Sequence, residues 1–241
     1  MTSLAIAVAG INGRMGRRIA ALIDDAPDLS LAGGLEQADT ALPPGAAVLI
    51  DFSSPEGFRH WLAACREAKV AFVSGTTGLA DEDLALLDEA ARDIPVFHAT
   101  NTSLGVAVLN RLAAEAARLL GADYDIEIVE LHHRHKKDAP SGTADTLAGA
   151  ILGASGRSRD DLAFGRHGME PRRGGSIGVH SLRLGDIVGE HTAHFATDGE
   201  RLELTHKATT RDTFARGALR AARWIAGRPP GRYGMGDVLE M

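Results

Sequence analysis

The amino-acid sequence predicts an α/β protein with two domains, and three features of its apolar pattern support this fold class. Up to about residue 103, strand-like runs alternate with helix-like segments, which indicates a parallel sheet with helices on both faces. Between residues 176 and 209, three strand-like runs follow one another without helices, which indicates a mostly antiparallel sheet. A last helical segment would return the chain to the first domain. We therefore expect one domain from residues 1–103 and 212–241 and a second, α+β domain from residues 104–211.

Apolar periodicity and helix-start signals define the elements of the first domain. Ile19, Leu22, Ile23 and Ala26 have helical spacing. Further helices are expected to start at residue 55, where a proline suits the first helical position, and at residue 81, where three acids suit the positive end of a helix. The strands are expected at residues 4–10, 29–36, 46–53, 70–75 and 94–99.

The second domain begins with a long helix and ends with a hairpin. Asp198-Gly199 between two strand-like runs is a typical hairpin turn. Residues 155–175 are polar and rich in arginine and glycine, so we expect a connector there. The expected helices are 103–120, about 141–152 and a final one around residues 214–225, and the expected strands are 123–133, 176–185, 187–197 and 200–209.

Composition excludes several classes of protein. The net charge of −6 argues against a general nucleic-acid binder. The single cysteine, Cys65, lies on the apolar side of an expected helix and fits a packed thiol in a reducing compartment. No apolar run reaches the ~18 residues of a membrane span, and the first residues lack a signal-peptide pattern. We expect a cytoplasmic protein without membrane or nucleic-acid partners.

The segment GINGRMG, Gly10 to Gly16, lies between the first strand and the first helix. Glycines there let the backbone bend and approach a pyrophosphate held at the helix N-terminus. Gly13 and Gly16 fit the last two positions of the common dinucleotide-binding pattern, while Gly10 comes one residue early. Glu36 ends the second strand, where an acid can accept hydrogen bonds from a ribose. These features favour dinucleotide binding over a purely structural turn.

Two polar loops follow the fourth and fifth strands, at residues 75–77 and 99–101. Ligands of open α/β sheets bind beyond the carboxyl ends of the strands, so both loops could line the nicotinamide side of a cofactor site. Ordinary turn chemistry is the alternative explanation for the same residues.

The segment ELHHRHKKDAPSGTA, Glu130 to Ala144, concentrates positive charge in an acidic protein. Pro140 ends the cationic run, and Ser141-Gly142-Thr143 begins a helix, whose free N–H groups and dipole attract a carboxylate or phosphate. The combination predicts an anion-binding pocket rather than a solvated basic face. His132 and Lys136 in this run are candidates for proton transfer. A metal site is less favoured, because the interleaved cations would repel a metal ion.

The segment Glu127–Ala144 resembles the signature of the dihydrodipicolinate reductase family, also called 4-hydroxy-tetrahydrodipicolinate reductases, of the diaminopimelate and lysine pathway. The resemblance extends over nearly the whole chain, through GINGRMG, IDFSSPEG, GTTG, GDIVGEHTAHF, ERLELTHKA and MGDVLEM. It implies a homotetrameric oxidoreductase with a Rossmann-type dinucleotide-binding domain and a substrate-binding domain whose sheet makes the subunit contacts. The implied reaction is the NADH- or NADPH-dependent reduction of a cyclic imine dicarboxylate to tetrahydrodipicolinate.

The resemblance also implies roles for individual residues. His132 and Lys136 match the proton-donating pair, and His133, Gly142 and Thr143 match contacts to the dicarboxylate substrate. The matches to cofactor-binding segments are Gly10, Ile11, Asn12, Gly13, Arg14, Met15, Glu36, Gly75, Thr76, Thr77, Ala99, Thr100, Asn101 and Thr102. No metal is implied.

The chain is shorter than better-known members of the family between Glu36 and Asp51, so we expect a peripheral helix and strand to be missing there. Glu36 would repel the 2′-phosphate of NADPH unless cations offset its charge. Gln37 and Ser54, where many members carry basic residues, are neutral. We therefore expect NADH to be preferred and NADPH to be accepted.

Three alternative functions fit parts of the sequence. The first is another two-domain dehydrogenase that acts on an aspartate-derived aldehyde. The second is a redox-sensing regulator that binds NADH without turnover, although the sequence offers no DNA-binding helix pair. The third is a metal-binding module, which would hold zinc after purification.

Overall fold

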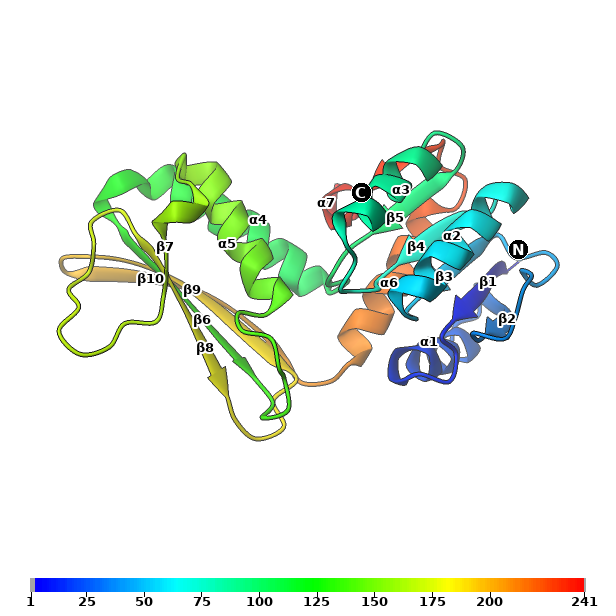
Figure 1. The fold of residues 1–241 in the computed structure, drawn as a ribbon, viewed down its shortest axis with the longest axis horizontal. Coiled ribbons are helices and arrows are strands. Elements are labelled where there is room, and N and C mark those ends of the chain that lie inside the picture. Colours follow the sequence, from blue (N-terminus) through cyan, green and yellow to red (C-terminus); the bar gives the residue numbers. More distant parts are fainter. Residues whose placement is uncertain (1–2, 241) are drawn as a thin grey trace. The chain divides into compact units, whose positions relative to one another are not determined.

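A six-stranded parallel sheet forms from both ends of the chain in the computed structural model, which describes residues 3–240. It belongs to a first compact unit that runs to Leu104 and resumes at Arg211 (Figure 1). The strand order is β11-β5-β4-β3-β1-β2. The strands are β1 (Leu4–Ala9), β2 (Leu29–Leu35), β3 (Val48–Asp51), β4 (Ala71–Ser74), β5 (Pro95–His98) and β11 (Gly231–Tyr233).

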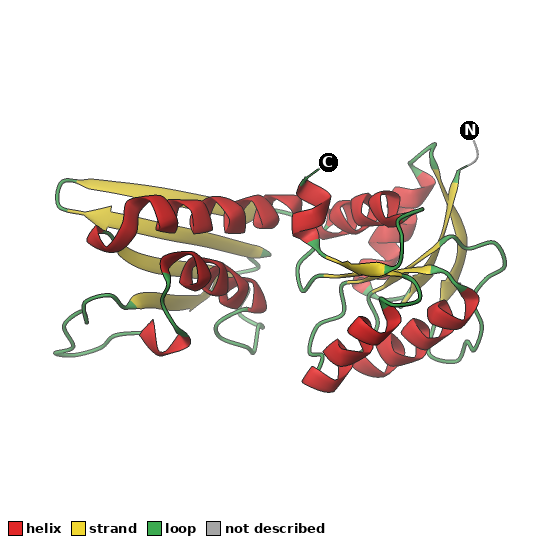
Figure 2. Cartoon of the chain, turned by 90° about the horizontal axis from the view of Figure 1, so that it is seen from above, coloured by secondary structure: helices red, strands yellow, loops and turns green. Residues whose placement is uncertain are grey.

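Helices cover both faces of this sheet, as the edge-on view in Figure 2 shows. Helices α2 (Pro55–Ala68) and α3 (Asp81–Ala90) pack on one face, and α1 (Arg14–Asp24) and α6 (Asp212–Ile225) pack together on the other. Ser54 caps α2 by accepting a hydrogen bond from the amide of Gly57, and Phe58 and Trp61 are buried beneath it. Burying such a side chain contributes about 1.5–3 kcal/mol, which explains why the apolar stripe predicts this helix. The short helix α7 (Met235–Leu239) ends the unit.

The second unit, Gly105 to Thr210, is a five-stranded sheet with helices on one face. Its strand order is β10-β9-β6-β8-β7, and its core packs side chains of α4 and α5 against β6, β8 and β9. The elements are α4 (Leu104–Leu120), β6 (Asp125–His132), α5 (Gly142–Ser155), β7 (Leu162–Phe164), β8 (Ile177–Arg183), β9 (Gly189–Thr197) and β10 (Glu200–Ala208), with short 3-10 turns at Gly121–Asp123 and Arg159–Asp161.

The α/β fold class is confirmed, with one correction to the second sheet. That sheet is mixed rather than mostly antiparallel, because β8 pairs in parallel with both β6 and β7 while β9 pairs antiparallel with β6 and β10. Helix α5 returns the chain to the start of the sheet before β7, and the connector of residues 165–176 returns it again before β8, so both strands run parallel to β6. The three-residue strands β7 and β11 were not predicted, since three residues carry too little periodicity.

The short segment after Glu36 contains no helix or strand up to residue 47. Within residues 3–240, β2 is therefore an edge strand of the first sheet. The segment lies against β2, since a Cβ on Gly33 would come within 2.7 Å of the Pro43 ring. None of the described helices is long and apolar enough to cross a membrane.

Candidate active site

The parallel strands of the first unit end at one edge of their sheet, and this edge gathers the expected cofactor segments. Gly10 follows β1, Glu36 follows β2, the 75–77 loop follows β4 and the 99–102 loop follows β5. Open α/β sheets bind their ligands at this edge.

The glycine-rich turn has the geometry of a phosphate cradle. Gly10 adopts a φ of 75°, which favours glycine, and a Cβ on Gly16 would lie 2.1 Å from the Gly10 carbonyl oxygen. Gly13 caps α1 without a side-chain hydrogen bond, so the amides of the first turn, which begins with Arg14 and Met15, remain for an anion.

Glu36 is tied to the same turn. Its Oε1 accepts a hydrogen bond from the Asn12 amide at 2.7 Å, and Gly34 leaves room for the Ile11 side chain beside it. A carboxylate next to an uncapped helix N-terminus fits the ribose and pyrophosphate of a dinucleotide. These residues therefore fit NAD(P)H.

In each of the two remaining loops, after β4 and after β5, a threonine hydroxyl group donates a hydrogen bond that fixes the loop. Thr76 Oγ1 donates to Asp51 Oδ2 at 2.7 Å, and Thr102 Oγ1 donates to the Phe214 carbonyl at 2.7 Å. Asp51 is buried at the end of β3, and its burial raises its pKa despite hydrogen bonds from Ser53, Thr76 and Ser74. Asp51 was not predicted, although an acid ending an apolar strand was a usable signal. Thr77, Ala99, Thr100 and Asn101 lie in the same loops.

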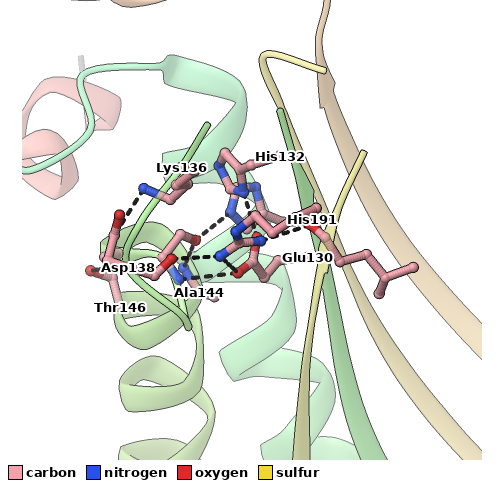
Figure 3. A network of polar contacts seen from close by, with 11 residues as sticks. Glu130, His132, Lys136, Asp138, Ala144, Thr146 and His191 are labelled. Carbon is pink, nitrogen blue, oxygen red and sulfur yellow. Dashed lines mark hydrogen bonds and ion pairs between the residues drawn. The ribbon is translucent and has the colours of Figure 1, made fainter. Parts of the chain in front are cut away.

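The second unit carries a buried charged cluster at the end of β6. Side chains alternate along a strand, so Glu130 and His132 lie on the same, helix-covered face as Ile126 and Ile128. Glu130 is fully buried, and its Oε2 bonds directly to His132 Nδ1 (Figure 3).

Arg183 at the end of β8 completes this cluster. Its two terminal nitrogens donate to the two oxygens of Glu130 at 3.0 and 2.7 Å, and the Ser141 amide donates to Oε1 at 3.2 Å. Burial alone would raise the pKa of Glu130, but the hydrogen bonds from His132 and Arg183 outweigh it and hold that pKa well below its usual range. The carboxylate is therefore ionised.

His191 on β9 lies beside this pair in a neutral form. Its ring centroid is 5.1 Å from that of His132, and burial together with the nearby His132 lowers its pKa to about 3. Its Nε2 lies 3.1 Å from Ser141 Oγ. The same hydroxyl oxygen accepts a hydrogen bond from the Ala144 amide at the start of α5.

Donor atoms of Glu130, His132 and His191 lie within 4.8 Å of one another, so a metal site must be considered. Both Glu130 oxygens already accept hydrogen bonds from Arg183, whose fixed positive charge opposes a metal ion at the same place. The cluster fits a proton-transfer site better than a metal site.

The loop between β6 and α5 brings the other predicted residues of this unit to the same place. Lys136 is mostly buried, and its Nζ lies 2.8 Å from Asp138 Oδ2 (Figure 3). Gly142 begins α5 beside Thr143, and a Cβ on Gly142 would meet no atom within 4 Å. His133 lies between His132 and Lys136, with its ring centroid 6.2 Å from that of His135.

Glu130, Arg183 and His191 were missed as site residues. Glu130 belongs to the quoted basic segment, where its position two residues before His132 on a strand was a signal. Arg183 and His191 come from other strands, and only their pairing with β6 brings them to the site.

Comparison with known proteins gives consistent matches over the chain. The family model described as dihydrodipicolinate reductase, C-terminus, matches residues 105–239. The N-terminal model of the same family matches residues 4–46 and 39–102, two pieces that overlap in the short segment after Glu36.

Curated relatives and a solved structure agree with these models. The 4-hydroxy-tetrahydrodipicolinate reductase of Myxococcus xanthus is 45% identical over 96% of both chains, and that of Nitrosomonas eutropha is 46% identical over 99% of both. The structure of dipicolinate-bound dihydrodipicolinate reductase from Paenisporosarcina sp. TG-14 superposes with a TM-score of 0.75 at 22% identity, over 97% of this chain and 98% of that chain. That likeness supports the fold.

Proposed function

Because the chain belongs to the dihydrodipicolinate reductase family, we propose that it is a 4-hydroxy-tetrahydrodipicolinate reductase, an NAD(P)H-dependent oxidoreductase. Its reaction is the reduction of the cyclic imine dicarboxylate to tetrahydrodipicolinate. The observation that carries the proposal is the cluster at the end of β6, where an ionised carboxylate, a histidine and a lysine lie beside the N-terminus of α5. The helix N-terminus can bind a carboxylate of the substrate, and the histidine or the lysine can donate a proton to it.

The residues that would hold the cofactor lie in the first unit. The amides of the turn from Gly10 to Met15 would bind the pyrophosphate, and Glu36 would accept hydrogen bonds from the ribose. The 75–77 and 99–102 loops would line the nicotinamide. The bound cofactor supplies the hydride that reduces the substrate.

The residues of the second unit would bind and protonate the substrate. The amides at Gly142 and Thr143 and the side chain of His133 would bind its carboxylates, since the start of α5 attracts anions. Lys136 or His132 would donate the proton that accompanies reduction, because Lys136 lies in the loop that follows His132 at the end of β6.

The test is a coupled assay in which pyruvate and aspartate semialdehyde generate the substrate and NADH oxidation is followed by absorbance. We expect oxidation that depends on the complete mixture. A folded protein that oxidises neither NADH nor NADPH under these conditions would refute the proposed function.

We further propose that NADH is preferred over NADPH. Glu36 repels a 2′-phosphate, Gln37 offers no charge to offset it, and Ser54 is engaged in capping α2. Gln37→Arg is the better test variant, because replacing Ser54 would also remove a cap worth ~1 kcal/mol. Gln37→Arg should move the ratio of kcat/KM values toward NADPH, while Gln37→Met, of similar length but uncharged, should not. A parent that favours NADPH about tenfold, equivalent to ~1.4 kcal/mol, contradicts the proposal.

We also propose that the protein is a homotetramer in the cytoplasm. The face of the second sheet opposite α4 and α5 carries Val129, Leu131 and Leu182, and Leu182 is 42% exposed. Apolar side chains on a sheet face without a covering helix suit subunit contacts. The buried thiol of Cys65 is compatible with a reducing compartment.

A further inference from the structure

We propose that Glu130, held by Arg183, is a positioning residue that orients the His132 imidazole and places a fixed negative charge beside it. The inference rests on the proposed function, because it concerns proton donation in that reaction. It adds Glu130 and Arg183 to the residues on which His132 depends.

The carboxylate of Glu130 is fixed on every side. Oε2 bonds to His132 Nδ1 and accepts a hydrogen bond from Arg183, while Oε1 accepts hydrogen bonds from Arg183 and from the Ser141 amide. Glu130 is fully buried, so water does not compete for these contacts. Charge-assisted hydrogen bonds of this kind hold a defined geometry.

This arrangement determines which nitrogen of His132 can exchange a proton. An ionised carboxylate only accepts hydrogen bonds, so Nδ1 must carry a proton, and Nε2 is left as the reactive atom. A Cβ on Gly189 would lie 3.0 Å from Nε2 and crowd the ring, so the glycine leaves room for this orientation.

Charged groups around His132 come from several elements. Glu130 lies on the same strand, Arg183 on β8, and Lys136 and Asp138 in the following loop. His191 on β9 is neutral near pH 7, and His206 on β10 has a pKa lowered by its burial. Among these groups, Glu130 bonds directly to His132, and Arg183 bonds to that same carboxylate.

The opposite face of β6 provides a matched control. Glu127, three residues before Glu130, bonds to His180 Nε2 at 2.7 Å and to Arg166 at 2.7 Å, and it also pairs with Arg172. It is the same combination of acid, histidine and arginine on the same strand, without a proposed catalytic residue.

The experiment is the pH profile of kcat/KM in the coupled assay for Glu130→Gln, Arg183→Met, Arg183→Lys and Glu127→Gln. Glu130→Gln should lower kcat/KM by about 10- to 100-fold, part of the ~10²–10⁴ that a positioned proton donor contributes. Its alkaline limb should move to lower pH by about one unit, because the negative charge is lost and Arg183 remains. Arg183→Met should move the alkaline limb to higher pH, because it removes the positive charge that offsets the negative charge of Glu130.

The charge-preserving variant Arg183→Lys and the control variant Glu127→Gln separate this role from a merely structural one. Arg183→Lys and Glu127→Gln should leave the limb in place, whatever they do to stability. The inference would be overturned if Glu130→Gln and Arg183→Met both lowered kcat/KM but did not move the alkaline limb of the pH profile in opposite directions. Should Glu130→Gln fail to fold, as judged by circular dichroism, the difference between Arg183→Met and Arg183→Lys decides. A parent protein without reductase activity refutes the proposed function instead.

Discussion

At the scale of single residues, neighbouring side chains decide the chemical state of each group at the end of β6. Glu130 remains ionised although it is buried, because Arg183 and His132 supply hydrogen bonds to it. His191, a few ångströms away, contacts the Ser141 hydroxyl rather than a carboxylate and is neutral, since burial and the nearby His132 lower its pKa to about 3. Burial by itself therefore predicts the neutral state of His191 but not the ionised state of Glu130.

Replacing Lys136 by alanine tests its proposed role as a proton donor. We expect kcat to fall by ~10²–10⁴-fold, the usual contribution of general acid catalysis. The neighbouring Lys137 is exposed, so Lys137→Ala should leave kcat close to the parent value. Steady-state kinetics of both variants are the measurement. Normal kcat with a raised KM in Lys136→Ala would assign Lys136 to substrate binding instead.

His191 should make folding stability depend on pH. Its folded pKa of about 3 lies below the unfolded value of ~6.5, so unfolded chains bind more protons between these pH values. The contribution of His191 to stability is complete above pH ~6.5 and is lost as pH falls toward 3. Between pH 7 and pH 5 the free energy of unfolding of the parent should therefore fall by about 1–2 kcal/mol more than that of His191→Gln.

Urea titrations at these two pH values provide the measurement for His191→Gln. Glutamine can keep the hydrogen bond with Ser141, so the variant removes the titrating group with little change in shape. His60→Gln, on an exposed position of α2, is the control and should behave like the parent. Equal pH dependence in the parent and in His191→Gln would contradict the assigned neutral state.

At the scale of elements, the N-terminus of α5 connects the fold to the chemistry. Ser141 caps the helix through the Ala144 amide, while its own amide binds Glu130 and its hydroxyl contacts His191. The first turn of α5 is thereby tied to β6 and β9, whose strand pairing positions the cluster. The basic loop between β6 and α5 therefore has both of its ends fixed by hydrogen-bonded elements.

Gly142→Ala tests whether the start of α5 binds a substrate carboxylate. The added Cβ meets no protein atom, and alanine in a helix stabilises by ~0.4–1 kcal/mol, so the variant should fold at least as well as the parent. Pyridine-2,6-dicarboxylate should inhibit the parent competitively with substrate. We expect its inhibition constant to rise at least about tenfold in Gly142→Ala, equivalent to the loss of one charge-assisted hydrogen bond of ~1.5 kcal/mol.

A second glycine of the same helix supplies the control for this measurement. Gly149 is exposed and also has open space around a Cβ, so Gly149→Ala should leave the inhibition constant unchanged. Equal inhibition of the parent and Gly142→Ala would remove the helix terminus from the proposed binding site.

At the scale of the whole molecule, two units with different kinds of sheet divide the proposed tasks. The parallel sheet of the first unit ends in the loops proposed for the cofactor, and the mixed sheet of the second unit carries the basic loop. Within residues 3–240, helices α4 and α5 cover one face of the second sheet, and the uncovered face motivates the proposed assembly.

Analytical ultracentrifugation should give a mass of four times the chain mass of 25.4 kDa. Leu182→Asp places a charge on the open face of the second sheet and should shift the protein toward smaller species. Leu86, 36% exposed on α3 of the first unit, provides the control Leu86→Asp, which should remain assembled. A monomeric parent, or a tetramer unaffected by Leu182→Asp, would contradict the proposed interface.

The sequence by itself determined the features that depend on neighbouring residues. The helix Pro55–Ala68 follows from its cap, its proline and its apolar stripe, and alternating segments up to residue 103 predict the parallel sheet. The long motif from Glu127 to Ala144 was sufficient to identify the family, which the comparisons confirm. The roles of His132 and Lys136 remain predictions.

Tertiary structure alone decided the features that depend on distant residues. Strand β8 pairs in parallel with β6, although the two strands are far apart in the sequence. This pairing places Arg183 against the Glu130 carboxylate. The antiparallel pairing of β9 does the same for His191. Local spacing carries no information about such contacts, because they are set by which strands meet and in which register. For that reason the sequence motif alone did not indicate the proposed role of Glu130, which is to orient His132 in the folded chain.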